Sequence, residues 1–267
     1  MVATRERSEG EPRKMSVIGN NAATVTPGRC EARRESLAQY LANREFASSS
    51  ELRRLARFGP DAVRRPDAGG FTGSAMGEAL HALLLEPEVF ESQYLVLDGS
   101  VPSNKVLSER EAMTREWLDA WQWAALVKAR DAIVACTQGP LADWLGRGEK
   151  ELSIYWTDEA GSKWKARPDC FTEEIVLDLK TTADCRPEAF ARTRERLAYD
   201  LQAAHYVEAV LRLTGRRPRF AFVAAELEPP YAVFVHELAG GELEAAIERL
   251  EDVKRRFTSS VAASTRA

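Results

Sequence analysis

The chain has few of the residues that bind soft metals. Its 267 residues include only four cysteines and three histidines. No two cysteines have a Cys-x-x-Cys spacing, so the sequence supports neither a zinc knuckle nor a cysteine-ligated iron–sulfur cluster. We expect reduced thiols, several of them buried, at Cys30, Cys136, Cys170 and Cys185.

Long apolar runs are also missing. No stretch approaches 18 consecutive apolar residues, and the N-terminus has no apolar signal region. We therefore expect a cytoplasmic protein without a membrane segment. A hydrophobic content of 45% in a chain of this length is enough to bury a core as one domain, or as one domain with a helical appendage.

The chain has no surplus of positive charge. Its formal net charge is −4, whereas proteins that bind nucleic acids typically show a basic footprint. Arginines nevertheless gather in two segments, Arg53 to Arg65 and Arg192 to Arg196. They can line a local basic channel or form solvated helix faces, and the sequence leaves both readings open.

What the chain does contain is a charged motif at the end of an apolar strand. Residues 163–169 and 174–180 both have strand patterns and predict a hairpin that brings Asp169 near Asp178. Alternation places Asp178 and Lys180 on one strand face, ~7 Å apart along the strand. Such a pair is usually a solvated ion pair, but here it ends a strand of buried type. Two carboxylates and an ammonium are what metal-dependent phosphodiester cleavage needs.

Two helices can bring further polar groups to this place. Tyr199, Gln202 and Tyr206 fall at i, i+3 and i+7 on one face of a predicted helix. Residues 73–85 predict an apolar helix that carries His81. A single histidine on an apolar helix is more often a hydrogen-bonded core residue than a metal ligand, and both readings are kept.

The rest of the pattern predicts an α/β protein with polar or small-residue ends. Residues 1–32 have no period and residues 258–267 are a run of small residues, so we expect both segments to be disordered. Tryptophans 117, 121, 123 and 144 are expected to pack rather than stack on bases. Further helices are predicted at 33–44, 50–58, 108–145 with a break near Gly139-Pro140, 187–196, 199–213 and 241–257, and further strands at 92–97, 151–157, 219–226 and 231–237.

Taken in order, these motifs resemble those of the PD-(D/E)xK nuclease superfamily. They are most similar to the nuclease domain of the RecE exonuclease, and the ordered set also marks the RecB-like branch. The resemblance covers about residues 48–257 and implies a restriction-endonuclease-like α/β fold. That fold is a mixed central sheet flanked by helices, here with an N-terminal helical part, in a nuclease domain at 33–257. The matching residues are Gly77-x-x-x-His81, Arg167-Pro168-Asp169, Asp178-x-Lys180-Thr181-Thr182 and Gln202-x-x-x-Tyr206.

The resemblance also implies roles for single residues. Asp169 and Asp178 would bind a divalent metal, Mg²⁺ or Mn²⁺, and His81 would add a ligand or hold one of the waters of the metal. Lys180 would orient or activate the attacking water, and Gln202 would shape the site. The implied catalytic set is therefore Lys180, Asp169, Asp178 and Gln202, and the implied DNA-binding set is Tyr206, Gln202, Arg167, Thr181 and Thr182.

A nuclease that acts on DNA ends is the activity that the resemblance implies. Such an enzyme digests one strand of linear double-stranded DNA from its 5′ end and leaves a 3′ tail for an annealing protein, as in phage or prophage recombination, and relatives of this kind form ring-shaped homo-oligomers. The alternatives are a RecB-like nuclease of other polarity or with endonuclease action, and a catalytically silent DNA-binding subunit. The intact catalytic set argues against the last, because a retired site has no chemical reason to keep all four groups.

Overall fold

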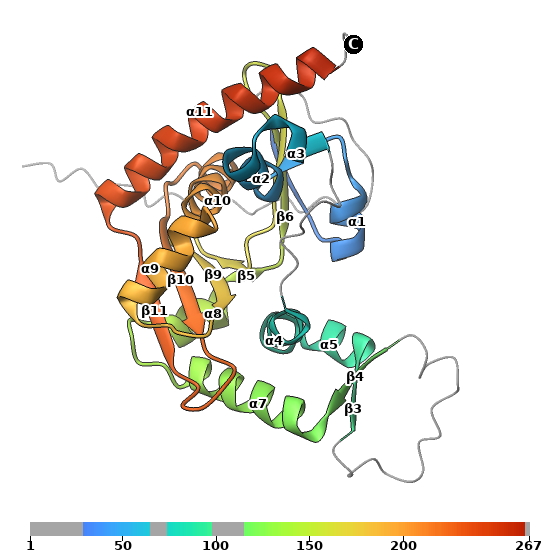
Figure 1. The fold of residues 1–267 in the computed structure, drawn as a ribbon, viewed down its shortest axis with the longest axis vertical. Helices are drawn as coiled ribbons and strands as arrows, with labels where there is room; N and C mark the ends of the chain where they lie inside the picture. The colour runs from blue at the N-terminus through green and yellow to red at the C-terminus, as the bar shows by residue number, and fades with distance from the viewer. Residues whose placement is uncertain (1–28, 65–73, 98–114, 265–267) are drawn as a thin grey trace, which may run out of the picture.

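Residues 29–64, 74–97 and 115–264 are described by the structure, a computed structural model, and form two main sheets and a short strand pair flanked by helices (Figure 1). The four-stranded sheet has the order β1 (Cys30–Arg33), β6 (Ser153–Thr157), β7 (Lys163–Ala166), β2 (Ala47–Ser48). The five-stranded sheet has the order β11 (Val233–Glu237), β10 (Arg219–Ala225), β9 (Ile175–Thr181), β8 (Cys170–Phe171), β5 (Glu149–Lys150). The short pair joins β3 (Tyr94–Leu97) and β4 (Glu116–Asp119).

Ten helices surround these strands in the described part of the chain. They are α1 (Leu37–Ala42), α2 (Ser49–Phe58), α3 (Pro60–Arg64), α4 (Ala75–Leu85), α5 (Pro87–Gln93), α7 (Ala120–Val134), α8 (Leu141–Arg147), α9 (Pro187–Arg196), α10 (Tyr199–Thr214) and α11 (Gly240–Ser264). Within the described residues, no helix combines the length and the apolar character needed to cross a membrane.

The five-stranded sheet is mixed and is covered on both faces. β9 and β10 are parallel and are linked through α9 and α10, whereas β8 and β11 join the sheet antiparallel. Val176 of β9 packs into the core shared with α10 and α11, while Leu177 and Leu179 pack into the core shared with α4 and α7. This double coverage explains why β9 is apolar nearly throughout. The α/β class with a mixed central sheet flanked by helices is thus confirmed.

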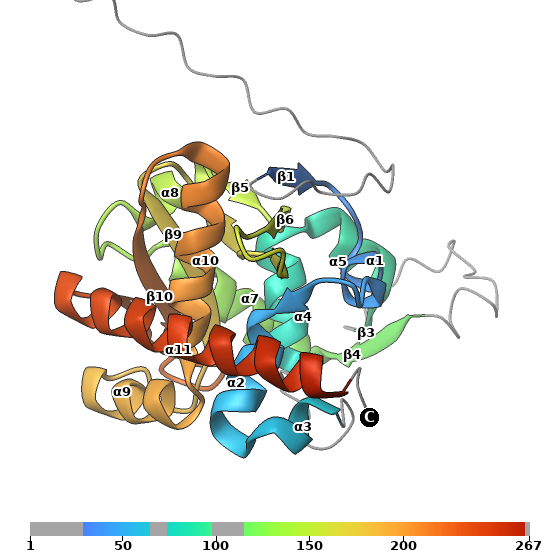
Figure 2. The ribbon, with the colours of Figure 1, turned by 90° about the horizontal axis from the view of Figure 1, so that it is seen from above.

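The N-terminal helical part lies against the helices of the first core. α2 contacts both α10 and α11, and the three helices lie together in the view from above (Figure 2). Leu52 and Leu55 are the buried apolar residues of α2, and both belong to that core. α2 is therefore part of the same packed unit as the strand that carries the charged motif.

The predicted hairpin is formed by other residues than the sequence suggests. The strand expected at 163–169 ends at Ala166 and belongs to the four-stranded sheet, and β8 is the antiparallel partner of β9. Pro168 has no backbone N–H for a strand ladder, which is a reason for the break between the two strands. Asp169 therefore lies at the point where the chain passes from one sheet to the other.

Both ends of the described chain are more ordered than the composition suggests. Cys30–Arg33 forms β1, although residues up to 32 are expected to be disordered; residues 1–28 lie outside the described part. The helix expected at 33–44 is limited to α1, which Ser36 caps. α11 continues to Ser264, so 258–264 is helical and not a disordered tail. Alanine favours helix, and the hydroxyls of Thr258, Ser259 and Ser260 donate to carbonyls of the preceding turn.

The segment expected as one broken helix at 108–145 contains a strand. Its first part, 108–114, lies outside the described residues, and Glu116–Asp119 forms β4, which pairs with β3. Trp144 is buried and Trp123 packs against the core, as expected, whereas Trp117 and Trp121 are 52% and 61% exposed. All four cysteines carry free thiols, and Cys170 and Cys185 are buried.

Candidate active site

The candidate site forms where β9 runs past the end of β8. β8 pairs with β9 only as far as Leu177, so the next backbone groups on that edge have no strand partner. The carboxylate of Asp169 accepts a hydrogen bond from the Leu179 N–H at 2.6 Å, and Nε2 of His81 on α4 lies 3.0 Å from the Leu179 carbonyl oxygen. The backbone N–H and carbonyl of Leu179, which have no strand partner on this edge, therefore find hydrogen-bond partners in two predicted metal ligands.

The contact at Leu179 fixes the chemistry of the His81 ring. A carbonyl oxygen only accepts hydrogen bonds, so Nε2 carries the proton and Nδ1 of the neutral ring keeps a lone pair. Nδ1 faces Oδ2 of Asp169 at 3.6 Å. Two lone pairs that face each other at this distance need a positive charge between them, either a proton or a metal ion. The contact with Leu179 is the one expected of a hydrogen-bonded core histidine, while the contact with Asp169 and the 29% exposure of the side chain fit a metal ligand.

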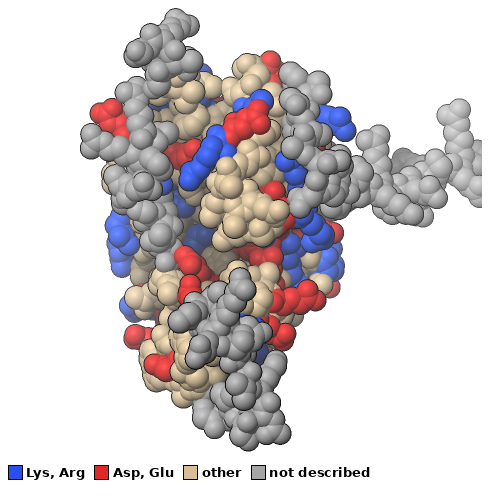
Figure 3. Space-filling view, turned by 90° about the vertical axis from the view of Figure 1, so that its right-hand side faces the viewer, with Lys and Arg blue, Asp and Glu red and all other residues tan. Residues whose placement is uncertain are grey.

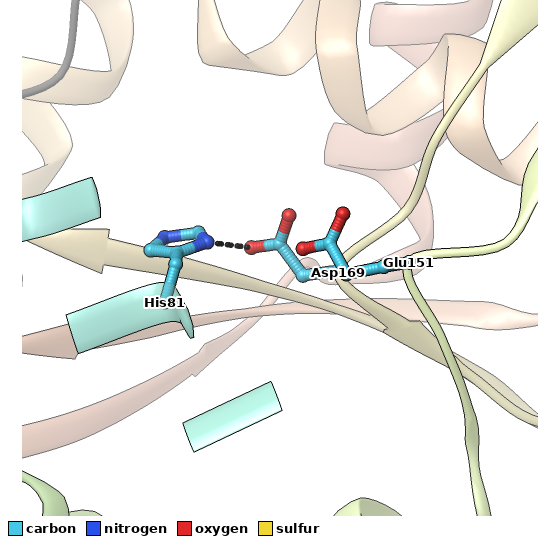
Figure 4. Close-up of side chains that lie close together, drawn as sticks. All are labelled: His81, Glu151 and Asp169. Atoms are coloured by element: carbon cyan, nitrogen blue, oxygen red, sulfur yellow. Dashed lines mark ion pairs between the residues drawn. The ribbon is translucent and has the colours of Figure 1, made fainter. Parts of the chain in front are cut away.

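Glu151 joins this pair, although no local sequence pattern points to it. Ligand atoms of His81, Glu151 and Asp169 lie within 4.8 Å of one another, and the two carboxylates lie side by side facing the imidazole (Figure 4). Glu151 lies between β5 and β6 with a φ of 49°, a left-handed conformation that is uncommon for glutamate. Burial, and then Asp169, raise the pKa of Glu151 to about 8, although Arg167 opposes them.

Arg167 holds Glu151 in place. Its Nε donates to Glu151 at 2.7 Å, and Nη1 donates to the Glu35 carbonyl at 2.8 Å; Nη2 also contacts Glu86 at 3.3 Å. The residue is only 5% exposed. The guanidinium predicted to bind DNA therefore contacts protein groups. Its position favours a role in holding Glu151 within the acidic cluster that Glu151 forms with Asp169.

Asp178 and Lys180 form a buried ion pair on the α10 side of β9. Asp178 is fully buried, and its Oδ2 pairs with Nζ of Lys180, whose side chain is 14% exposed. Three influences together bring the pKa of Asp178 to about 6: burial raises it, Lys180 lowers it and Asp169 raises it. Burial alone would lower the pKa of Lys180, but Asp178 and Asp169 outweigh it and hold the pKa above its ordinary value. An ionised pair at neutral pH follows, unlike the solvated pair of the alternative reading.

From α10, Gln202 reaches the Asp178 carboxylate, and Tyr206 lies next to Gln202. The Gln202 side-chain amide donates to Oδ1 of Asp178 at 3.2 Å and to the Tyr206 hydroxyl at 3.0 Å. Both residues are 7% exposed, and burial together with Asp178 raises the pKa of Tyr206 well above its ordinary value. The contact of Gln202 with Asp178 fits the site-shaping role, while contact of Gln202 and Tyr206 with a DNA backbone remains a prediction.

The two threonines of the motif, Thr181 and Thr182, lie at the end of β9. Thr181 is half-buried and packs against Gly77 of α4, where an added Cβ would be 2.8 Å from its Oγ1. The Thr182 hydroxyl donates to the Asp184 carbonyl at 3.1 Å. Thr181 therefore has a packing role toward the His81 helix, and the predicted DNA contacts of both threonines remain untested.

Acidic side chains gather around a hollow in the middle of one face of the molecule (Figure 3). Repulsion between carboxylates and phosphate disfavours the approach of nucleic acid to such a surface. A bound divalent cation would reverse the local charge. The electrostatics therefore agree with a metal-dependent site better than with direct phosphate binding.

The donor set suits Mg²⁺ or Mn²⁺. Asp169 and Glu151 bring carboxylate oxygens into one cluster with His81. Asp178 does not belong to that cluster in the described part of the chain, and its oxygens contact Gln202 and Lys180. Each of these oxygens keeps a second lone pair that a cation could use. Such hard oxygen donors fit Mg²⁺, and the imidazole of His81 adds a nitrogen that Mn²⁺ accepts more readily. The facing lone pairs of His81 and Asp169 give a cation a place between two elements, α4 and the start of β8.

Comparison with known proteins gives one family and one informative structure. The model of a PDDEXK-like domain of unknown function (DUF3799) matches residues 71–264. A crystal structure of a protein from Eubacterium rectale, provisionally described as an exonuclease, aligns with a TM-score of 0.59 and 16% identity over 85% of this chain and 88% of that chain. The structure of SSO0001 aligns with a TM-score of only 0.33 at 14% identity over 82% and 81% of the two chains. Comparison with curated protein sequences gave no match.

Proposed function

The chain belongs to the PDDEXK-like domain family, and from this premise we propose that it is a metal-dependent deoxyribonuclease. The family and the fold support a nuclease. The observation that carries the metal-dependent chemistry is the pair of facing lone pairs on His81 and Asp169, with Glu151 beside them. Asp169, Asp178, Glu151 and His81 are the residues that would hold the cation. When bound, Mg²⁺ or Mn²⁺ would act as a Lewis acid on the phosphate and lower the pKa of water.

The protein's own groups have separate tasks in this proposal. Lys180 is held by Asp178 with its ammonium protonated, so it can orient a water molecule and offset charge that develops on the phosphate. Gln202 fixes the rotamer of Asp178 through its amide. Tyr206 stays protonated because of its raised pKa, and its hydroxyl accepts a hydrogen bond from the Gln202 amide. The Leu179 backbone ties Asp169 and His81 to the same strand.

A RecE-like exonuclease is the finer activity that we propose. It would degrade one strand of linear duplex DNA from the 5′ end and leave 3′ tails for an annealing protein, in the cytoplasm and in a phage or prophage recombination setting. The greater similarity of the motifs to those of the RecE nuclease domain supports this choice over a RecB-like nuclease of other polarity or with endonuclease action, since the motif order is common to both. A catalytically silent DNA-binding subunit is disfavoured because the ion pair, the acidic cluster and Gln202 are held together in one site.

A homo-oligomer is part of the same proposal. The chain is acidic overall, and a closed ring would pool arginines of several copies around one axis. Light scattering at micromolar concentration measures the assembly. A monomer that digests long DNA processively would contradict the ring.

One assay tests the activity and its mode. The purified protein is given Mg²⁺ or Mn²⁺ and linear duplexes labelled at the 5′ or the 3′ end, with a covalently closed circle as the matched substrate without ends. We expect release of mononucleotides from 5′ ends while the circle stays intact. Cutting of the circle would favour the endonuclease alternative, and undiminished cleavage in excess chelator would remove the metal-dependent mechanism.

A further inference from the structure

Arg53 connects the N-terminal helix α2 to the candidate site. It is 5% exposed, and its Nη1 lies 3.3 Å from Oε1 of Gln202. Its Nε donates to the Leu197 carbonyl at 2.9 Å, just before α10 begins. Arg53 lies outside the segment 71–264 that the family model matches.

The contact with Arg53 determines which way the Gln202 amide points. A guanidinium has only donors, so the Gln202 oxygen must face it. The amide nitrogen is then directed at Asp178 and the Tyr206 hydroxyl. A flipped amide would place NH₂ against the guanidinium and oxygen against the Asp178 carboxylate, and both contacts would be repulsive.

Arg53 also contacts a second residue of the same helix face. Its Cζ lies 4.6 Å from the centroid of the Tyr199 ring, and Nζ of Lys180 lies 5.0 Å from the same centroid. Cations at this distance are attracted by an aromatic ring. Arg53 thus contacts Gln202, which donates to Asp178, and Tyr199, whose ring also lies near Lys180.

We propose that Arg53 is a positioning residue that orients Gln202, and through it Asp178, for the metal-dependent reaction. The inference rests on the proposed function. Burying a guanidinium carries a large desolvation cost, and apolar side chains could join α2 to α10 without it. An arginine at this place is explained by the fixed fork of donors that it offers to Gln202 and Leu197.

A double-mutant cycle tests whether Arg53 acts through Gln202. The variants are Arg53→Met, Gln202→Leu and the double variant, measured by kcat and KM on linear duplex DNA. We expect Arg53→Met to lower kcat by about 10-fold or more, in the range known for residues that orient metal ligands, with KM within about 3-fold. In the Gln202→Leu background the same change should cost less than about 2-fold, because residues that act as one unit are not additive. Equal losses in both backgrounds, or a wild-type kcat in Arg53→Met, would overturn the proposal.

Metal binding gives a readout that does not depend on cleavage. Calorimetry with Mn²⁺ should show affinity about 10-fold or more weaker for Arg53→Met and an intermediate value for Arg53→Lys, which keeps the charge but loses the fork. If Arg53→Met does not fold, Arg53→Lys replaces it in the double-mutant cycle. Its loss in kcat should again be less than about 2-fold in the Gln202→Leu background. Arg212→Met is the matched control, because it removes a guanidinium paired with Glu208 and Glu159 elsewhere on α10. If the wild type binds Mn²⁺ but does not cleave DNA, the proposed function fails; unchanged Mn²⁺ affinity in both Arg53 variants makes this inference fail instead.

Discussion

Asp178 and Lys180 share one buried ion pair, yet the site assigns them different tasks. In the proposed function Asp178 would offer oxygens to a cation, whereas Lys180 would offer a protonated ammonium that Asp178 and Asp169 stabilise. Removing either partner leaves the other without its counter-charge in a buried place. Stability and function therefore have to be measured separately for each variant.

Asp178→Asn should lose cleavage and tight metal binding together. Lys180→Met should lose cleavage, by about 10²–10⁴-fold in kcat, but should keep Mn²⁺ binding, because the carboxylates stay in place and the cation supplies the counter-charge that Asp178 has lost. Asp178→Asn leaves the Lys180 ammonium unpaired and should cost about 3 kcal/mol of unfolding free energy. Calorimetry and single-turnover cleavage separate the two variants.

The control is Asp184→Asn. It removes a nearby carboxylate whose partner is Arg186, and its cleavage rate should stay within about 2-fold of wild type. Normal cleavage in both Asp178→Asn and Lys180→Met would remove the assignment of the site.

Glu151 makes the stability of the protein depend on pH and on metal. Its pKa is raised to about 8 in the folded state from an ordinary value of 4.5. Between these values the folded state holds a proton that the unfolded state has lost, so stability falls as pH rises. Between pH 6.5 and pH 8 we expect Tm to fall by about 4–8 °C in chelator, for a loss of ~2 kcal/mol.

Two controls identify Glu151 as the origin of this slope. Glu151→Gln has no charge to bury, so its Tm should be nearly constant over the same window. Millimolar Mg²⁺ should restore the wild-type Tm at pH 8, because a ligand that binds only the folded state stabilises it. A wild-type Tm that rises with pH in chelator would show that Glu151 does not keep its proton.

Local sequence motifs revealed part of the site and could not reveal the rest. Asp178 and Lys180 are two residues apart on one strand, and Gln202 and Tyr206 are one helical turn apart, so each pair follows from its period. Glu151 and Arg53 reach the site only through tertiary contacts and have no local pattern. The resemblance implies that Arg167 binds DNA, but its burial gives it Glu151 and Glu86 as partners.

At the scale of elements, the position of His81 depends on how closely α4 approaches β9. Gly77 lies one turn before His81 and faces the end of β9, where a Cβ would be 2.8 Å from Thr181 Oγ1 and 3.2 Å from Ser74 Oγ. The Gly77-x-x-x-His81 spacing therefore has a physical meaning. The glycine admits the strand, and the histidine one turn later reaches the Leu179 carbonyl.

Gly77→Ala should push α4 away from β9 and lower kcat by about 10-fold or more, because small displacements of catalytic groups are costly. Thr181 is β-branched and adjusts its rotamer poorly. The Thr181→Ala background removes the clashing atoms, so Gly77→Ala should cost much less there. Gly146→Ala is the matched control, since an added Cβ at this helical glycine has open space. Equal losses with and without Thr181 would exclude the steric explanation.

Long, strongly periodic elements were predicted better than short ones. β9, α9 and α10 lie within a residue or two of their expected bounds. β8 has two residues and β4 has four, and neither offers enough residues for a period to be read. The break at Arg167-Pro168 decides which strand pairs with β9, so the hairpin was misassigned although Asp169 still lies beside β9.

At the scale of the whole molecule, the charge distribution separates the approach of DNA from its cleavage. The net charge is −4, and acidic side chains surround the hollow of Figure 3. Many of the arginines in the described part of the chain are already in ion pairs with acidic residues; examples are Arg147, Arg216, Arg219 and Arg249. DNA affinity should therefore depend on the bound cation as well as on basic residues.

Ca²⁺ tests this dependence, because it binds the same oxygen donors as Mg²⁺ but in a larger and less regular coordination shell. We expect duplex DNA to bind at least about 10-fold more tightly in Ca²⁺ than in chelator, since the cation cancels repulsion between the carboxylates and the phosphate, while cleavage stays at background. Fluorescence anisotropy with an end-labelled duplex measures the affinity at one fixed salt concentration. The variant Asp169→Asn with Asp178→Asn should bind DNA with little response to Ca²⁺, because it lacks two of the carboxylates that would hold the ion. Equal affinity of the wild type in chelator and in Ca²⁺ would mean that DNA is held by the protein's own cations and that the acidic hollow lies off its path.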